Sequence, residues 1–446
     1  MMPILLATRI RTEERMRFGI LATLLLFNSL VLESNEVMAT GGFANQVGVS
    51  FLPWLWAADM MIVMLTSAVY SLQVDRSDRN RLTVIILAGL ALAYSLLFGA
   101  FVLEAPDWLT YSIFTILTDQ QWLLVPMLVW ALVNDAFSTT AAKRIIPLMG
   151  IAVLVGRVLG NAIVAGVAPL LADSRLGSIP LLLTNAILLF ILAGLYAVTM
   201  RLLQINARRA TDESILANLR EGIAFVQAVP AYRFLAIAMM LLGFGLNIIE
   251  FHFIWRVATQ FTQLADLEFF YSVFKIVSLV LLTILQGWAV TKLLDRLGFQ
   301  RIFACMPVTM MGALLVALAW PSIGGITVGN LCTRAVLLGV DEPARHAFQG
   351  LVPDERRGRV SAVMDGYLYP VGAIVSCAFL LLLFAFVGTT WLTLGVAQLL
   401  YLGGGLLCVG GALYAIRQMY ITYDTSMLNW RLQRKRRASQ LDQLQF

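Results

Sequence analysis

Charged residues are scarce in this sequence. Only 13% of its 446 residues are Asp, Glu, Lys or Arg, whereas 60% are hydrophobic and the mean hydropathy is +0.82. Soluble domains average about 25% charged residues. The composition therefore excludes a soluble globular protein and predicts that lipid surrounds most of the chain. In such a protein the distribution of the charges along the chain matters more than the net charge of +6, and we expect no nucleic-acid partner.

Motifs for catalysis and metal binding are also missing. The sequence has no G-x-x-x-x-G-K-[ST], H-E-x-x-H or G-x-S-x-G pattern, and it has only two histidines. Its four cysteines are isolated within apolar runs, a pattern typical of small packed residues rather than of disulfides or zinc ligands. We therefore expect no enzyme activity, no cofactor and no metal site.

Long apolar runs are abundant. About 20 apolar residues suffice for one transmembrane helix. Twelve runs meet this requirement, at 17–40, 50–73, 82–104, 111–135, 145–171, 179–201, 233–257, 268–291, 302–320, 323–349, 361–387 and 390–416.

A polar segment divides these twelve runs equally. In 202–232, the residues Ile215, Leu216, Leu219, Ile223 and Val226 recur at helical spacing, which predicts an amphipathic linker. We therefore expect a tail at 1–16, a six-helix half at 17–201, the linker, a second half at 233–418, and a basic tail at 419–446. Arginine and lysine are concentrated in alternate loops, which places both termini in the cytoplasm.

A loop motif occurs once in each half. The sequence D-R-x4-R follows the second run of each half, and in this position it resembles a cytoplasmic signature of the major facilitator superfamily. The resemblance implies an all-α membrane protein with twelve transmembrane helices in two pseudo-symmetric halves. It also implies a gating role for the loop residues Asp75, Arg76, Arg81, Asp295, Arg296 and Arg301.

Three basic residues lie deep in predicted transmembrane helices. Arg157, Lys275 and Arg334 have no acidic residue one turn away on their own helix face, whereas Arg345 can pair with Asp341 in its own helix. A charge at this depth either pairs or faces water. The three are therefore candidate substrate contacts for an anion, together with Asn161. The alternative is a set of interhelical salt bridges, such as Arg157 with Asp119 or Lys275 with Glu250.

Acidic residues lie at similar depths. They are candidates for binding a coupling proton or sodium ion, and they are Glu33, Glu36, Asp59, Asp119 and Glu250. The glycines Gly156 and Gly160 beside Arg157 form a G-x-x-x-G pattern, which predicts close packing with another helix.

The segment NDAFSTTAAKRIIPLMGIAVLVGRVLGN, at 134–161, resembles the bacterial and plastid ATP/ADP antiporters, and LVPDERRGRVSAVMDG, at 351–366, resembles a stretch of their relatives. The resemblance implies nucleotide transport in a bacterial inner membrane. It also implies a cytoplasmic regulatory domain or protein as a partner, since bacterial members are often fused to HEAT or cyclic-nucleotide-binding domains. Where nucleotide-exchanging members carry basic residues in the first helix, this sequence has Glu33 and Glu36, which reverses the local field.

Three functions are compatible with these patterns. The first is a secondary transporter that moves an organic anion, such as a nucleotide, by alternating access through a cavity between the halves. The second is a transporter-like receptor or scaffold coupled to a cytoplasmic domain or partner. The third is a lipid transporter, for which membrane lipids would be substrate as well as surroundings.

Overall fold

The computed structural model describes residues 11, 14–74, 78–203, 215–286, 301–349, 352, 359–361, 363–387 and 393–442. Within these residues the regular structure is entirely helical, as the sequence predicts. Two compact units divide the chain: unit 1 is Met1–Asp212 with Ile254–Val280, and unit 2 is Glu213–Phe253 with Leu281–Phe446. The loop residues Asp75, Arg76, Asp295 and Arg296 lie outside the described residues, and their gating role stays a prediction.

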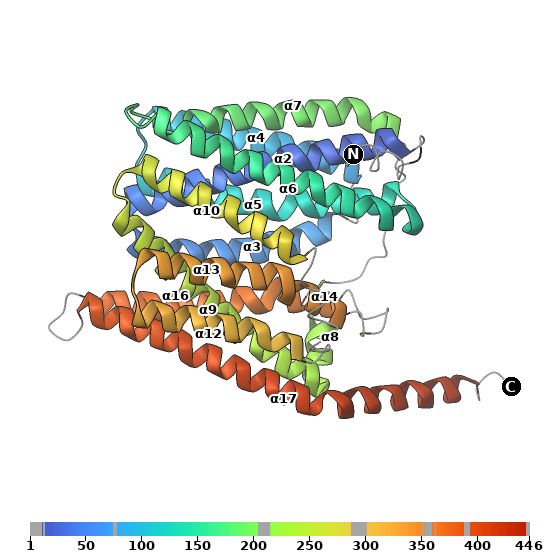
Figure 1. Ribbon diagram of the computed structural model, residues 1–446. Helices are drawn as coiled ribbons and strands as arrows, with labels where there is room; N and C mark the ends of the chain where they lie inside the picture. The colour runs from blue at the N-terminus through green and yellow to red at the C-terminus, as the bar shows by residue number, and fades with distance from the viewer. Residues whose placement is uncertain are drawn as a thin grey trace. The chain divides into compact units, whose positions relative to one another are not determined.

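Unit 1 contains six transmembrane helices of the first predicted half and most of a seventh from later in the chain. In Figure 1, helices α2, α4, α5, α6 and α7 lie side by side, and α2 packs against α5, α6 and α7. The helices are α2 (Arg15–Gly42), α3 (Leu52–Val74), α4 (Arg79–Val102), α5 (Asp107–Ala136), α6 (Thr139–Leu170), α7 (Pro180–Leu203) and α10 (Leu264–Ile284).

The first two transmembrane helices are separated by only a short irregular segment. One apolar span runs from Arg15 to Tyr70. As a single helix this span would be about 84 Å long at 1.5 Å per residue, which is far more than the thickness of a bilayer. A π-helical turn at Phe43–Gly48 and a 3-10 turn at Val49–Phe51 interrupt it, and Gly48 has a φ of 108°. Glycine adopts this conformation without steric cost. The eleven apolar spans of the described residues therefore correspond to the twelve predicted helices.

Unit 2 has more interrupted helices. They are α8 (Ile215–Ala228), α9 (Pro230–Gln260, whose last residues belong to unit 1), α12 (Cys305–Ala319), α13 (Ile323–Val336), α14 (Glu342–Gln349), α16 (Tyr369–Phe386) and α17 (Leu394–Asp442). A π-helical segment, Leu337–Asp341, joins α13 to α14, and a second, Met364–Leu368, precedes α16. Such π-helical turns are rare and occur often at functional sites.

The last helix is longer than the sequence analysis predicts. We expected it to end at 416, but α17 continues to Asp442. The segment 412–442 contains neither glycine nor proline and is rich in Arg, Gln and Leu, which are strong helix formers. The helix therefore continues into the predicted basic tail.

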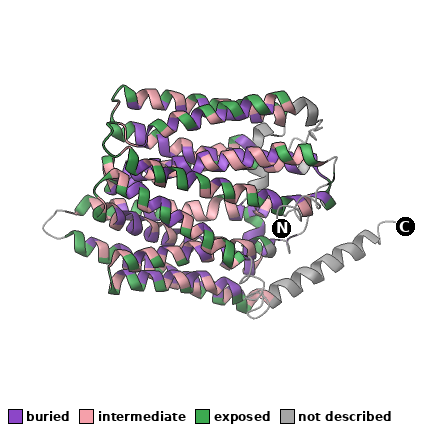
Figure 2. Ribbon diagram, turned by 45° about the horizontal axis from the view of Figure 1, so that its top comes forward, coloured by how far each residue is buried: buried purple, intermediate pink, exposed green. Residues whose placement is uncertain are grey.

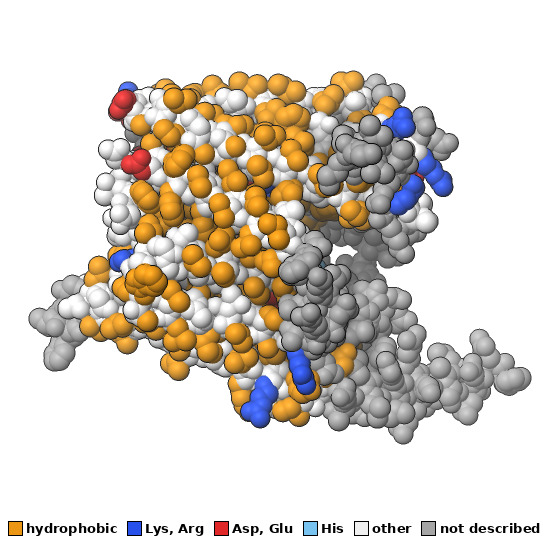
Figure 3. All heavy atoms as spheres, viewed as in Figure 1, with side chains coloured by type: hydrophobic (Ala, Val, Ile, Leu, Met, Phe, Trp, Pro, Cys, Tyr) orange, Lys and Arg blue, Asp and Glu red, His pale blue; other side chains and the backbone are white. Residues whose placement is uncertain are grey.

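The surface of the helices is apolar where lipid is expected. Large hydrophobic side chains such as Leu65, Leu96, Val198 and Leu407 are more than 60% exposed, and exposed positions mark the outer faces of the helices in Figure 2. In Figure 3, hydrophobic side chains cover the visible helix surfaces, whereas most visible Lys and Arg side chains lie toward helix ends. This distribution is that of an integral membrane protein.

Candidate functional site

Close packing of α6 against α2 forms the base of the candidate site. A side chain on Gly156 would clash with the backbone oxygen of Leu26, and one on Gly160 would clash with that of Leu30. The predicted G-x-x-x-G contact is thus confirmed, with α2 as the partner helix. Ser34 reinforces it by donating hydrogen bonds to the oxygens of Leu30 and Gly160, at 2.9 and 3.2 Å.

We expect Gly160→Val to destabilise the protein by about 1–3 kcal/mol, because an added side chain must push α2 and α6 apart. Gly150 and Gly166 are the matched controls, since they lie on the same helix and have open space around them. Alanine at either control position should leave stability unchanged or slightly raised. Thermal unfolding of the purified protein measures both effects, and equal stability of Gly160→Val and wild type would contradict this packing.

Glu33 on α2 is the centre of an ion-pair cluster. Its carboxylate accepts a hydrogen bond from Nε of Arg157 on α6 and another from the side-chain amide of Asn161, at 3.0 Å. It also accepts one from Nζ of Lys275 on α10, at 3.1 Å. Only 2% of the Glu33 side chain is exposed. Because two cations and an amide face it, this buried carboxylate is fully satisfied.

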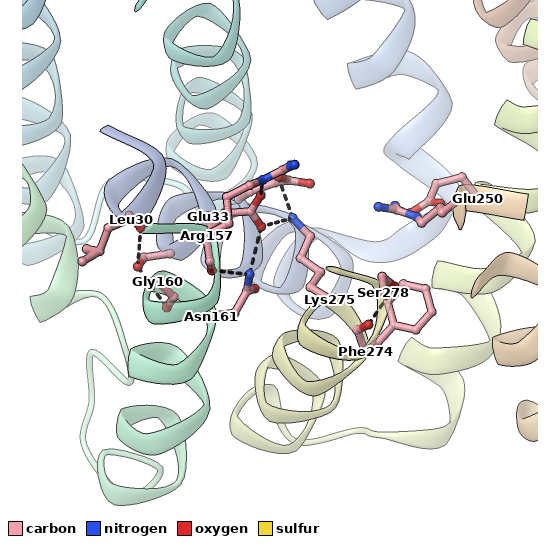
Figure 4. A network of polar contacts seen from close by, with 12 residues as sticks. Leu30, Glu33, Arg157, Gly160, Asn161, Glu250, Phe274, Lys275 and Ser278 are labelled. Atoms are coloured by element: carbon pink, nitrogen blue, oxygen red, sulfur yellow. Dashed lines mark hydrogen bonds and ion pairs between the residues drawn. The ribbon is translucent and has the colours of Figure 1, made fainter. Parts of the chain in front are cut away.

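Lys275 connects Glu33 to a second acid. Its Nζ lies 2.6 Å from a carboxylate oxygen of Glu36, one turn further along α2 than Glu33, and only 6% of its side chain is exposed. Figure 4 shows Glu33 lying between Arg157 and Lys275, with Asn161 beside them. We call Glu33, Glu36, Arg157, Asn161 and Lys275 the Glu33 cluster. All five residues belong to unit 1.

The interhelical partners differ from the examples that the sequence suggested. We named Asp119 as an example for Arg157 and Glu250 for Lys275. In the structure Arg157 pairs with Glu33. Lys275 pairs with both Glu33 and Glu36. The reason is the G-x-x-x-G contact, which brings α2 close enough to α6 for its acidic residues to reach Arg157. The type of partner, an acid on another helix, is that of the salt-bridge alternative that the sequence left open.

Unit 2 contains a smaller pair of the same kind. Arg334 on α13 donates to Glu250 on α9, at 2.6 Å, and Asn330 donates to the same carboxylate, at 3.1 Å. Nε of Arg334 donates to the side-chain oxygen of Asn330, one turn earlier, at 3.2 Å. Each unit therefore has an arginine, an asparagine four residues away and an acid on a neighbouring helix.

The remaining candidates lie elsewhere. Asp59 on α3 is buried and faces Asp119 on α5. Among the described residues, the ion pair shown for Arg157 is with Glu33 and not with either aspartate. Arg81 is exposed on α4. Arg301 is also exposed, and its guanidinium lies 5.9 Å from the ring centre of Tyr420.

A further ion-pair cluster lies beside the two π-helical segments of unit 2. Arg345 donates to Asp341 and to Asp365, each at 2.9 Å, and its guanidinium lies 4.9 Å from the ring centre of Tyr369. The predicted pairing with Asp341 is confirmed. Asp365 was not predicted as a partner, since no spacing rule connects it to Arg345 across the intervening loop.

Comparison with known proteins identifies the fold. No protein-family model matches the chain, and no curated protein matches it by sequence. Among solved structures, the nucleoside transporter NupG has a TM-score of 0.66 at 13% identity, covering 91% of this chain and 100% of its own.

Two other solved structures agree. The human organic anion transporter MFSD10 has a TM-score of 0.53 at 17% identity, covering 92% of this chain and 100% of its own. The xylose transporter XylE from E. coli has a TM-score of 0.57 at 14% identity, covering 89% and 95%. The fold is that of the major facilitator superfamily of membrane transporters.

Proposed function

We propose that the chain is a secondary transporter that moves a small organic anion, with the Glu33 cluster of unit 1 as its binding site. The observation that carries the proposal is the convergence of Arg157 and Lys275 on one buried carboxylate. Two cations at this depth require strong compensation. Here the carboxylate of Glu33 compensates the two positive charges. The negative oxygens of an anionic substrate could compensate them in the same way.

The exposure of Arg157 supports an anion as substrate. About a third of the Arg157 side chain, 30%, is exposed, whereas Glu33 is almost inaccessible. A ligand that approaches the cluster therefore reaches the guanidinium of Arg157 before the carboxylate of Glu33, and it also meets Glu36, which is 29% exposed. Guanidinium groups bind carboxylate and phosphate oxygens through two parallel hydrogen bonds. An arriving anion would compete with Glu33 for Arg157 and Lys275.

Arg334 and Asn330 extend the proposal to unit 2. The Arg334 side chain is 28% exposed, and its partner Glu250 is 22% exposed, so this pair is also open to a competing anion. In the alternating-access mechanism both halves contribute to a central site. This proposal includes the two predicted halves, 17–201 and 233–418. It also includes a location in a bacterial inner membrane, with both termini in the cytoplasm.

The substrate within the class is proposed from the sequence resemblance. The likeness of 134–161 to the ATP/ADP antiporters favours a nucleotide. NupG and MFSD10, by their names a nucleoside and an organic anion transporter, have the same fold, although identities of 13% and 17% do not carry a substrate over. Glu33 and Glu36 oppose a polyphosphate, so we propose a nucleotide or dicarboxylate of low charge.

Counterflow tests the proposal. Purified protein in liposomes preloaded with unlabelled AMP or succinate should take up the matching labelled compound from outside, whereas liposomes without protein should not. Arg157→Lys keeps the charge but loses the bidentate geometry, so its counterflow should be weaker at low substrate concentration. Uptake equal to that of empty liposomes for both compounds would contradict transport of these anions.

A second candidate function, a transporter-like receptor, is favoured by one observation. α17 has 49 residues and would span about 74 Å, more than twice the apolar thickness of a bilayer. Part of it must therefore extend beyond the membrane, where a cytoplasmic partner can bind. Counterflow in the test above would exclude a receptor without transport activity.

A further inference from the structure

Two aspartates meet inside unit 1, separate from the pairs described above. Asp59 on α3 is fully buried, and neither of its carboxylate oxygens has a hydrogen-bond donor among the described residues. Its side chain lies within hydrogen-bonding reach of Asp119 on α5, and α3 packs against α5. A buried ionised carboxylate without a hydrogen-bond donor is costly, so this one needs a proton or a cation to compensate its charge.

The surroundings of this pair contain few compensating charges. Asp119 lies close enough to Glu36 on α2, Lys275 on α10 and Tyr94 on α4 to interact with each of them electrostatically. The only cation in this set, Lys275, is already bound to Glu33 and Glu36. Two ionised carboxylates about 4 Å apart repel each other by about 4 kcal/mol at an effective dielectric constant of 20.

One proton removes this repulsion and supplies the missing donor. A protonated carboxyl of Asp59 donates its O–H to the ionised carboxylate of Asp119, or the reverse, so the pair holds one proton and one negative charge. A metal cation is the other means of compensation, but it needs several oxygen ligands. Among the described residues, no group of three or more acidic, His or Cys side chains is placed to hold one.

We propose that Asp59 and Asp119 share one proton and that this proton is the ion coupled to transport. The inference rests on the proposed function. Lys275 provides the connection, since it lies near Asp119 and binds both acids of α2 in the Glu33 cluster. When the proton leaves, the pair gains a negative charge that competes with Glu33 and Glu36 for Lys275. Proton release on one side of the membrane and anion binding are thereby linked.

Infrared spectroscopy tests the shared proton without any substrate. Purified wild-type protein at neutral pH should show the C=O band of a protonated carboxyl that is lost in both Asp59→Asn and Asp119→Asn. Loss is expected because the Asn amide donates to the remaining carboxylate, which then stays ionised. Asp266→Asn, at an exposed position on α10, is the control and should keep the band. Retention of the band in both site variants would overturn the proposal.

The ionic composition of the buffer separates a proton from sodium. Exchanging sodium for choline at constant pH should leave the wild-type band unchanged. Loss of the band in sodium would show that a sodium ion displaces the proton, and would overturn the assignment of the coupling ion.

Transport tests the coupling. With AMP and succinate as probes, a pH gradient should drive accumulation in wild-type liposomes, and this accumulation should be lost in Asp59→Asn. Counterflow needs no net proton movement and should persist at a reduced rate. Undiminished accumulation in Asp59→Asn would overturn the coupling role. If wild type shows no counterflow of either probe, the proposed function and the coupling role fall together, whereas the infrared band still decides whether the proton is present.

Discussion

Replacing Glu33 with alanine is expected to lower the free energy of unfolding by about 3–5 kcal/mol, because it removes a buried acid from the buried Lys275 and the partly exposed Arg157. Arg157 and Asn161 lose their carboxylate, and Lys275 keeps Glu36 alone. Thermal unfolding of the purified protein, followed by intrinsic tryptophan fluorescence, measures the loss.

Glu36→Ala is the matched control for this prediction. Glu36 lies on the same helix and binds the same lysine, but it is 29% exposed, and Lys275 keeps Glu33 when it is removed. We expect a loss of about 1 kcal/mol or less. Equal losses in Glu33→Ala and Glu36→Ala would contradict the central position of Glu33 in the cluster.

Replacing Arg345 with methionine is expected to have an effect of similar size, about 3–5 kcal/mol, although the volume is nearly kept. Arg345 is 7% exposed and lies between Asp341 and Asp365, so its removal leaves two acids without their cation. The additional change Asp341→Asn should recover part of the loss, since Asn can keep accepting the hydrogen bond that Tyr369 donates at 3.0 Å. Unfolding of the single and double variants measures the recovery.

Arg359→Met provides the comparison for Arg345. Arg359 pairs with Glu221, which is 54% exposed, and exposed ion pairs contribute about 0–1 kcal/mol. If Arg345→Met were no more destabilising than Arg359→Met, the buried ion pairs of Arg345 would not stabilise the protein more than an exposed pair does.

The helices were largely predictable because length and apolar composition define a transmembrane segment almost alone. The predicted run 17–40 corresponds to Arg15–Gly42, and 179–201 corresponds to Pro180–Leu203. The end of α17 was missed because hydropathy falls at 416 while helix propensity does not. The π-helical segments were also missed, since no residue pattern in the sequence announces the wider turn.

The candidate site was predictable in its residues and not in its pairings. Arg157, Lys275 and Glu33 were identified because a charge within an apolar run is rare and costly. Which acid meets which cation depends on helix packing, and only the contact of Gly160 with Leu30 decides that Arg157 faces α2. The proximity of Asp59 and Asp119 was equally inaccessible, because the sequence does not say that these two helices present their acids to each other.

The measurement that tests the central claim most directly is equilibrium binding to Glu33→Gln, using whichever of labelled AMP and succinate shows counterflow. This substitution keeps the shape of the side chain but removes the charge of Glu33, which competes with an anion for Arg157 and, together with Glu36, for Lys275. If the Glu33 cluster binds an anion through these cations, the variant should bind it more tightly than wild type, by about tenfold or more, equivalent to about 1.4 kcal/mol. Weaker binding in Glu33→Gln would show that Glu33 itself holds the substrate, and would contradict an anion site formed by Arg157 and Lys275.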